Sequence, residues 1–201
     1  NNTMRKDYTA NPLPVTSDLE GISLKSTQEH QKLYEGYVKK TNEVQAKLET
    51  VDRSAANGVY SEYGEMKRQE TFAVNGMKLH EIYFRLLGGD GEVGGALRTL
   101  IERDFGSVEA WKEDFTATGI SARGWAVLAY DTSDNRLHNY AMDAQNVGAV
   151  WGAVPLVPMD VYEHAYFMDH GVNRKAYIEA FIRQIDWSVV RELAERQGVV
   201  A

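Results

Sequence analysis

With 201 residues, of which 43% are hydrophobic, the chain can bury the core of one large domain or two small ones, which excludes an intrinsically disordered protein. It has no cysteine, which excludes disulfides, cysteine-ligated zinc, iron–sulfur clusters and thiol nucleophiles. The net charge of -7 argues against a nucleic-acid partner. The sequence shows neither a membrane span of roughly 20 apolar residues nor a signal peptide, so we expect a cytoplasmic protein with no membrane partner.

The first 88 residues predict an N-terminal helical hairpin domain behind an extended lead-in over residues 1–21. From about Ser23 to about Val51, apolar and aromatic residues recur at three- and four-residue steps, as on one face of a helix. Asn57-Gly58 breaks this pattern, and a second helix is predicted over roughly residues 60–87.

The remainder, residues 89–201, predicts a C-terminal domain with a three-stranded antiparallel sheet flanked by helices. Its first helices are expected over 96–104 and 108–118, its strands over 124–130, 136–142 and 154–159, and its last helices over 161–170, 174–185 and 188–196. Long helices followed by a small sheet and further helices place the chain in the α+β class.

Asp160 and His164 lie four residues apart, directly after the third predicted strand. If Asp160 opens a helix, His164 follows one turn later on nearly the same side, and the pair offers an oxygen and a nitrogen to one metal ion. His30 and His80 lie inside the two long helices among apolar neighbours. Together these residues predict a site between the two domains, whose open coordination position suits redox work by iron or manganese.

Other interpretations of the histidines stay open. Taken alone, a histidine inside a helix is more often a hydrogen-bonded core residue than a ligand. We expect His138, in a hairpin strand, and His170, at a helix end, to be solvated surface residues. A carboxylate-bridged di-metal site would need Glu three residues before each ligand histidine. The sequence disfavours that site, because those positions hold Thr27, Met77 and Val161.

Around these residues the chain resembles the iron/manganese superoxide dismutase family. Asp160-Val161-Tyr162-Glu163-His164-Ala165-Tyr166 is similar to the family's D-V-W-E-H-A-Y signature. Residues 75–80 resemble the second-helix segment that carries a ligand histidine, and residues 124–128 resemble the G-W-x-W-L strand. The resemblance covers about residues 12–190. It implies that superoxide is converted to dioxygen and hydrogen peroxide by one iron or manganese ion that cycles between two oxidation states.

The resemblance also implies the metal ligands, which are His30, His80, Asp160 and His164. The first helix departs from the family pattern, because Tyr37 follows His30 by seven positions rather than eight. Counting back from Tyr37 places Glu29 in the ligand position, whereas counting forward from Ile22-Ser23 places His30 there.

Helical geometry favours His30 as the first-helix ligand. At about 100° per residue, positions 30, 34 and 37 form one stripe, and Glu29 points away from it. Tyr34 and Tyr37 are therefore expected on the metal side. Tyr37 is the better candidate for the tyrosine that the family places at the substrate entrance.

Further roles follow from the resemblance. The Trp125 side chain would form one wall of the metal pocket. In the family, a glutamine or histidine donates a hydrogen bond to the metal-bound solvent, either from the second helix in typical iron enzymes or from the sheet in manganese enzymes. Here Gly76 holds the first position and Gln145 the second. The pattern therefore leans to manganese, with one ion per subunit.

The resemblance implies a homodimer or a dimer of dimers. Glu163 would pair with His164 of the partner subunit, and Arg174 would neutralise that buried acidic region. Tyr34 replaces a gateway histidine, and Phe167 replaces that histidine's tyrosine partner across the dimer. We expect the interface to persist through an aromatic contact without that hydrogen bond.

Tyr162 replaces the tryptophan of the signature, which should make the wall of the site smaller and more polar. Together with the changes at Tyr34 and Phe167, this motivates an alternative function. In that alternative the chain binds metal but has little or no turnover and serves a structural or other role.

Overall fold

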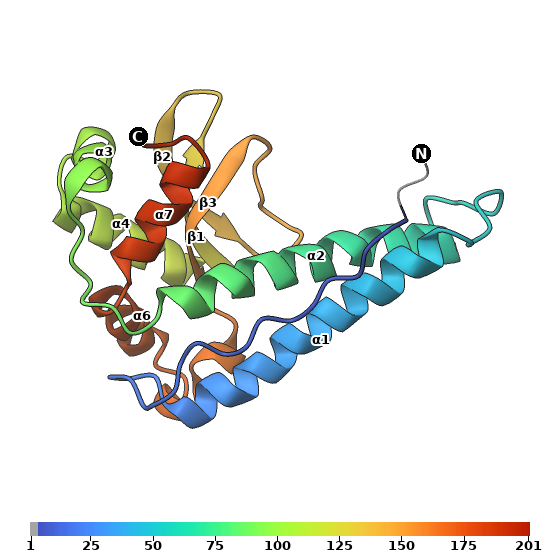
Figure 1. Cartoon of the computed structure of the whole chain (residues 1–201), viewed down its shortest axis with the longest axis horizontal. Helices are drawn as coiled ribbons and strands as arrows, with labels where there is room; N and C mark the ends of the chain where they lie inside the picture. Colours follow the sequence, from blue (N-terminus) through green and yellow to red (C-terminus); the bar gives the residue numbers. More distant parts are fainter. Residues whose placement is uncertain (1–3) are drawn as a thin grey trace.

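A computed structural model describes residues 4–201, and its N-terminal part is a long antiparallel helical hairpin (Figure 1). The hairpin consists of α1 (Leu24–Leu48) and α2 (Glu62–Leu86). Each helix begins at a serine whose side-chain oxygen accepts a hydrogen bond from a free amide of the first turn, at Ser23 for α1 and at Ser61 for α2. The first helix ends at Leu48, three residues before the predicted end, and residues 1–3 of the predicted lead-in lie outside the described part of the chain.

The C-terminal part is built around a three-stranded antiparallel sheet with strand order β2-β1-β3. The strands are β1 (Trp125–Asp131), β2 (Arg136–Met142) and β3 (Ala153–Asp160). The central strand β1 is buried along almost its whole length, since α4 packs against it and both neighbouring strands flank it. The helices before the sheet are α3 (Gly95–Phe105) and α4 (Val108–Ser121); those after it are η1 (Glu163–Ala165), α5 (Phe167–His170), α6 (Arg174–Arg183) and α7 (Trp187–Arg196). The predicted α+β fold is confirmed.

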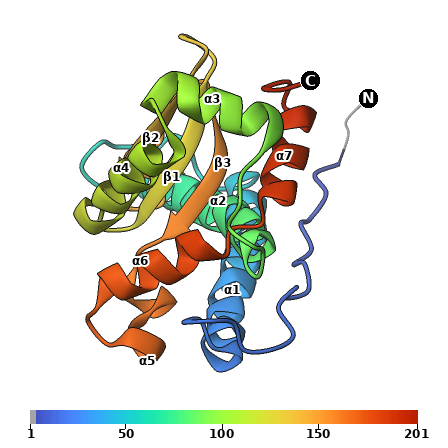
Figure 2. The same ribbon diagram turned by 90° about the vertical axis from the view of Figure 1, so that its left-hand side faces the viewer.

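The two parts meet where α2 lies across β3 (Figure 2). The last strand ends beside the start of α1 and the last turns of α2, where Asp160 meets His30 and His80. The segment before α1 runs alongside both long helices (Figure 1). The Tyr8 amide donates to the Asn42 side chain on α1, and that side chain donates to the Tyr8 carbonyl. Among residues 4–201, no helix is both long and apolar enough to cross a membrane.

One prediction about this junction is wrong: residues 161–170 are not a continuous helix, and Asp160 does not open one. Asp160 is the last residue of β3 and pairs with Trp125 in the sheet. Its Oδ1 then accepts a hydrogen bond from the Tyr162 amide, which turns the chain away from the strand. Only a 3-10 turn and the four-residue α5 follow, and α5 ends at Gly171, whose φ of 57° is unfavourable for a residue with a side chain.

Candidate metal centre

Four side chains from four segments converge at the junction of the two parts. Three imidazole nitrogens surround Oδ2 of Asp160: Nε2 of His30 at 2.8 Å, Nε2 of His80 at 3.2 Å and Nε2 of His164 at 2.8 Å. The two helical histidines approach each other to 3.1 Å between their Nε2 atoms. Ligand atoms about 2.1 Å from a common ion and at right angles to each other lie about 3.0 Å apart, so this spacing fits one ion.

The protonation of these groups also fits a metal centre. Burial lowers the pKa of His30 to about 4, which leaves this imidazole neutral with a free lone pair. Burial would raise the pKa of Asp160, but His164 and the hydrogen bonds from the other histidines hold it well below its usual value, so the carboxylate is charged. His80 donates from Nδ1 to the Gly76 carbonyl at 2.5 Å, which orients its ring and leaves Nε2 for a ligand.

The first helix places His30 in the cluster and Glu29 on the outside. His30 is almost fully buried, whereas Glu29 is exposed and pairs with Lys32. The regular turn of α1 produces this difference, because neighbouring residues point about 100° apart. The structure thus brings together all four residues that the resemblance implies as ligands.

Tyr34 lies on the metal side of α1, as the sequence predicts, but its hydroxyl has partners within its own chain. It is buried within its own subunit, where its hydroxyl donates to Glu81 Oε2 and accepts from the Asn11 amide at 3.0 Å. The segment before α1 covers this side of the helix, so Tyr34 cannot supply an aromatic contact to another subunit while that cover is in place. Its ring still packs near His80, with 6.4 Å between ring centroids, so it lies behind the cluster rather than at its opening.

Tyr37 lies beside the cluster, next to Gln145. The Tyr37 ring is 5.4 Å from that of His80. Burial and then the charge of Asp160 raise the pKa of Tyr37, and hydrogen bonding to Gln145 opposes this shift. The phenol is therefore protonated at neutral pH.

Gln145 occupies the space that a side chain at Gly76 would fill. A Cβ on Gly76 would come within 2.5 Å of Gln145 Nε2. The Gln145 side chain is fully buried, and its Nε2 donates to the Phe72 carbonyl on α2 at 3.0 Å. Within the described residues 4–201, its Oε1 has no hydrogen-bond partner, and neither has the buried Nε1 of Trp125. An unpartnered acceptor and an unpartnered donor beside the cluster are expected where a solvent ligand or further water completes a site.

Trp125 and Tyr162 border the cluster. Trp125 is fully buried, and its ring meets the His80 ring edge-on at 4.9 Å. Tyr162 is half-buried and stacks on His164 at 5.3 Å. The His164 side chain retains 28% of its exposure, so the cluster opens to solvent on this side.

The residues implied at a subunit interface have mixed surroundings. Glu163 is exposed and Phe167 is 52% exposed, so both are free to meet another chain. Arg174 instead donates to backbone carbonyls at the end of α4, including that of Ala122, and to the Tyr166 hydroxyl. No acidic side chain among residues 4–201 pairs with it, so the predicted neutralising role has no partner within the described chain.

Two buried tyrosines support the backbone at Asp160, and the sequence reasoning gave them no role. Tyr177 donates from its hydroxyl to the main-chain carbonyl of Asp160 at 2.7 Å, and its oxygen lies 2.9 Å from that of Tyr83. This chain of hydrogen bonds fixes the backbone that carries the ligand carboxylate. The spacing of tyrosines on α2 and α6 gives no sign that the two hydroxyls meet, because their sequence separation is 94 residues.

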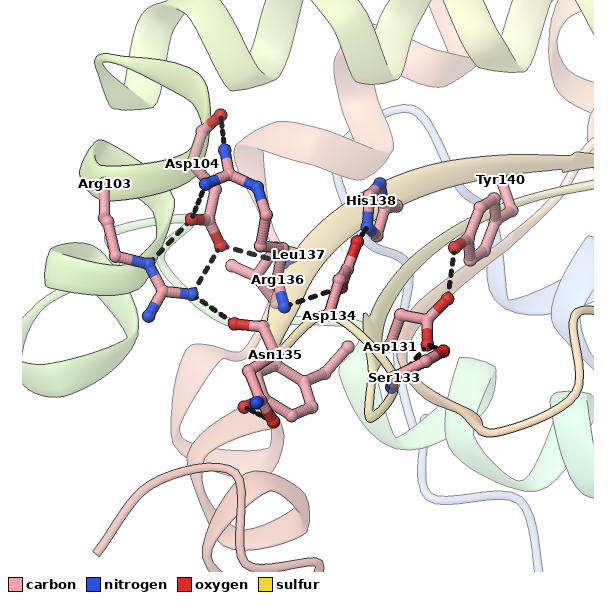
Figure 3. A network of polar contacts seen from close by, with 11 residues as sticks. Arg103, Asp104, Asp131, Ser133, Asp134, Asn135, Arg136, Leu137, His138 and Tyr140 are labelled. Atoms are coloured by element: carbon pink, nitrogen blue, oxygen red, sulfur yellow. Dashed lines mark hydrogen bonds and ion pairs between the residues drawn. The ribbon is translucent and has the colours of Figure 1, made fainter.

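A second group of ligand-type side chains lies at the β1–β2 hairpin (Figure 3). It consists of Asp131, Asp134 and His138, and its carboxylates already have protein partners. Asp131 accepts from Tyr140 and Ser133, while Asp134 binds the His138 ring at 2.7 Å. These side chains are therefore explained by the hydrogen bonds with which they stabilise the hairpin. His138 is partly exposed, and its imidazole contacts Asp134 instead of being fully solvated as the sequence predicts.

The comparisons with known proteins agree with this geometry. The family model described as iron/manganese superoxide dismutases, C-terminal domain, matches residues 93–193. A protein of Aquifex aeolicus named as an iron superoxide dismutase is 45% identical over 185 residues, which span 89% of this chain and 87% of the relative. An iron superoxide dismutase of Cupriavidus metallidurans is 43% identical, with 84% and 86% covered. A manganese superoxide dismutase of Haloferax volcanii is 35% identical, with 90% and 92% covered. The chain therefore belongs to the iron/manganese superoxide dismutase family.

Proposed function

We propose that this chain converts superoxide to dioxygen and hydrogen peroxide, with one iron or manganese ion held by His30, His80, Asp160 and His164. The observation that carries the proposal is the convergence of three imidazole nitrogens on one charged carboxylate oxygen. A bound ion would supply one-electron chemistry, through which one superoxide is oxidised to dioxygen and a second, with two protons, is reduced to hydrogen peroxide.

The protein's own residues would hold and direct the protons. Tyr37 stays protonated at neutral pH because of its raised pKa, so its O–H is available as a hydrogen-bond donor beside His80. Gln145 is fixed by the Phe72 carbonyl and would orient the solvent ligand. Trp125 and the Phe84 ring, which lies 5.0 Å from His30, keep bulk water from the inner side of the cluster.

We propose manganese as the resident ion. Support comes from Gln145, which reaches the site from the segment after β2 and takes the space beside Gly76, the arrangement that the family resemblance associates with manganese. The names of the relatives do not favour one metal, because both iron and manganese enzymes occur among them. Metal analysis of protein purified from cells grown with both metals tests this proposal, and a protein loaded with iron alone would contradict it.

We propose further that two subunits associate through the face that carries η1 and α5, with Glu163 near His164 of the partner subunit. Glu163, Phe167 and Met168 are exposed on this face, and the last two are apolar. Light scattering should give the mass of a dimer or a tetramer. A Glu163→Ala variant with unchanged assembly and unchanged metal retention would contradict this role for Glu163. The cytoplasmic location stays a prediction.

The direct test of the function combines metal analysis with a superoxide-consumption assay on the same sample. We expect about one ion per chain and rapid, metal-dependent consumption of superoxide. Bound iron or manganese without turnover would favour the alternative of a homologue that binds metal and has lost the activity.

A further inference from the structure

His170 is not the solvated surface residue that the sequence predicts. Its Nε2 lies 2.6 Å from the main-chain carbonyl oxygen of Gly21, to which it donates. The neighbouring Asp169 accepts a hydrogen bond from the Ser23 amide at 2.9 Å. Both contacts cross from α5 to the turn that starts α1, more than 140 residues away in sequence. We call this group of four residues the clasp: Gly21, Ser23, Asp169 and His170.

The clasp holds a turn that is already tightly shaped. Gly21 has a φ of 72°, and a Cβ there would come within 2.7 Å of the Ala180 side chain on α6. The turn is closed by a pair of main-chain hydrogen bonds between Leu19 and Ile22. Ser23 is also the N-cap of α1 and accepts from the Ser26 amide. A fixed turn and a capped first helical turn form a rigid unit, so a hydrogen bond to this unit constrains the direction of α1.

The partner side of the clasp is equally well anchored. The residues of α5 follow Tyr166, whose ring stacks on Tyr177 at 5.3 Å and whose hydroxyl accepts from Arg174. The His170 amide in turn donates to the Tyr166 carbonyl at 2.9 Å. The clasp therefore joins the start of α1 to the same short segment that carries His164.

The position of the clasp matters because the ligands belong to two parts of the chain. His30 lies seven residues beyond Ser23, about 10 Å along the helix axis. Most of the packing of α1 is against α2, and its contacts with the C-terminal part are few and lie near η1. The same turn is also held by the Gln184 side chain, which donates to the Glu20 carbonyl at 2.8 Å. Loss of the clasp should therefore loosen the first two turns of α1 relative to η1 without freeing them, and the separation of His30 and His164 should become less tightly fixed.

We propose that the clasp is a positioning device that sets the separation of His30 and His164 and so slows the release of the metal ion. The proposal rests on the proposed function, because it assumes that these two histidines hold the ion. His170 itself touches no ligand and is a positioning residue. Its effect is expected on metal retention and on the local mobility of α1 more than on overall stability.

The test compares His170→Ala with His170→Gln, whose side-chain amide can still donate to the Gly21 carbonyl. Manganese-loaded proteins are mixed with a coloured chelator, and the release rate is followed at a temperature where all remain folded. We expect release from His170→Ala to be about five-fold faster, the factor that the net contribution of one hydrogen bond implies. Release from His170→Gln should stay near that of the unchanged protein.

A matched control is His138→Ala, which removes a partly exposed histidine and its 2.7 Å contact to Asp134 on the distant hairpin. It should not change the release rate. Hydrogen exchange of the metal-free proteins gives a second readout, and the amides at the start of α1 should exchange faster in His170→Ala than in His138→Ala. If His170→Ala does not fold, Asp169→Ala compared with Asp169→Asn, which keeps an acceptor oxygen, repeats the comparison.

Equal release rates in the unchanged protein and in His170→Ala would overturn the proposal. So would an equal acceleration in His138→Ala, which would mean a general loss of stability. A different result marks failure of the proposed function itself: the unchanged protein would then retain no iron or manganese, whatever the state of the clasp.

Discussion

The exchange of Gly76 for alanine tests the role of Gln145 without replacing a ligand, and it keeps the main-chain carbonyl to which His80 donates. A Cβ on Gly76 would lie 2.5 Å from Gln145 Nε2, closer than two such atoms can approach, so the glutamine side chain must move. Because that amide nitrogen donates to the Phe72 carbonyl, the movement breaks this hydrogen bond. The change should therefore shift Gln145 and leave His80, four residues further along α2, in place.

The expected effects on stability and on turnover differ in size. The lost hydrogen bond costs about 1 kcal/mol of unfolding free energy. Replacing glycine inside a helix returns about 0.5–1 kcal/mol, so the net change in stability should stay within about 1 kcal/mol. Turnover should fall about 10- to 100-fold, the usual effect of disturbing a residue that hydrogen-bonds to a metal ligand.

Gly36→Ala supplies a matched control on the other long helix. A Cβ at Gly36 would meet no atom of residues 4–201 within 4 Å, apart from its chain neighbours and the backbone of its own helix. This variant should gain about 0.5–1 kcal/mol of stability and keep its turnover. Superoxide consumption per bound ion and thermal unfolding are measured for both variants. Full turnover in Gly76→Ala with one ion bound would refute the role given to Gln145.

Three further predictions concern the ligands and the two tyrosines. His80→Ala should abolish metal binding and activity together, and unchanged metal content would show that the ligand assignment is wrong. In the metal-free protein, the folded-state pKa of His30 is about 4 and its ordinary value is 6.5. The unfolded state therefore binds more protons than the folded state at pH values between 4 and 6.5. Unfolding free energy on the order of 3 kcal/mol, present above pH 6.5, should be lost as the pH falls to 4. Denaturant titrations at several pH values measure this loss, and an unfolding free energy that does not change with pH would contradict the prediction. Tyr37→Phe should reduce turnover with little change in stability. Tyr34→Phe should instead lower the unfolding free energy by about 1–2 kcal/mol, because it breaks the hydrogen bonds to Glu81 and Asn11. It should leave turnover per ion nearly unchanged. A larger loss of turnover in Tyr34→Phe than in Tyr37→Phe would reverse the roles assigned to the two tyrosines.

Much of the fold could be predicted because its elements have local causes. The periodicity of the two long helices and the serines before them mark their starts closely. The second strand, Arg136–Met142, has the predicted bounds. The segment after Asp160 could not be predicted from periodicity. Its apolar residues are spaced as in a helix, but the sheet pairing with Trp125 and the turn at Tyr162 determine its backbone.

The candidate site divides in the same way. The choice of His30 over Glu29 follows from helical geometry alone, and the structure places His30 with the other three residues. The surroundings of Tyr34 could not be predicted, because the segment that covers it comes from residues before α1 and has no regular pattern. The contact of His170 with Gly21 was equally hidden, since it depends on a glycine turn 149 residues away.

Anomalous scattering from crystals, recorded at the iron and manganese edges, tests the central claim most directly. We predict one peak per chain, at manganese, coordinated by Nε2 of His30, His80 and His164 and by Oδ2 of Asp160. A peak at iron in the same place would overturn the choice of metal and leave the site intact. An ion bound elsewhere, or at this place through other residues, would contradict the account.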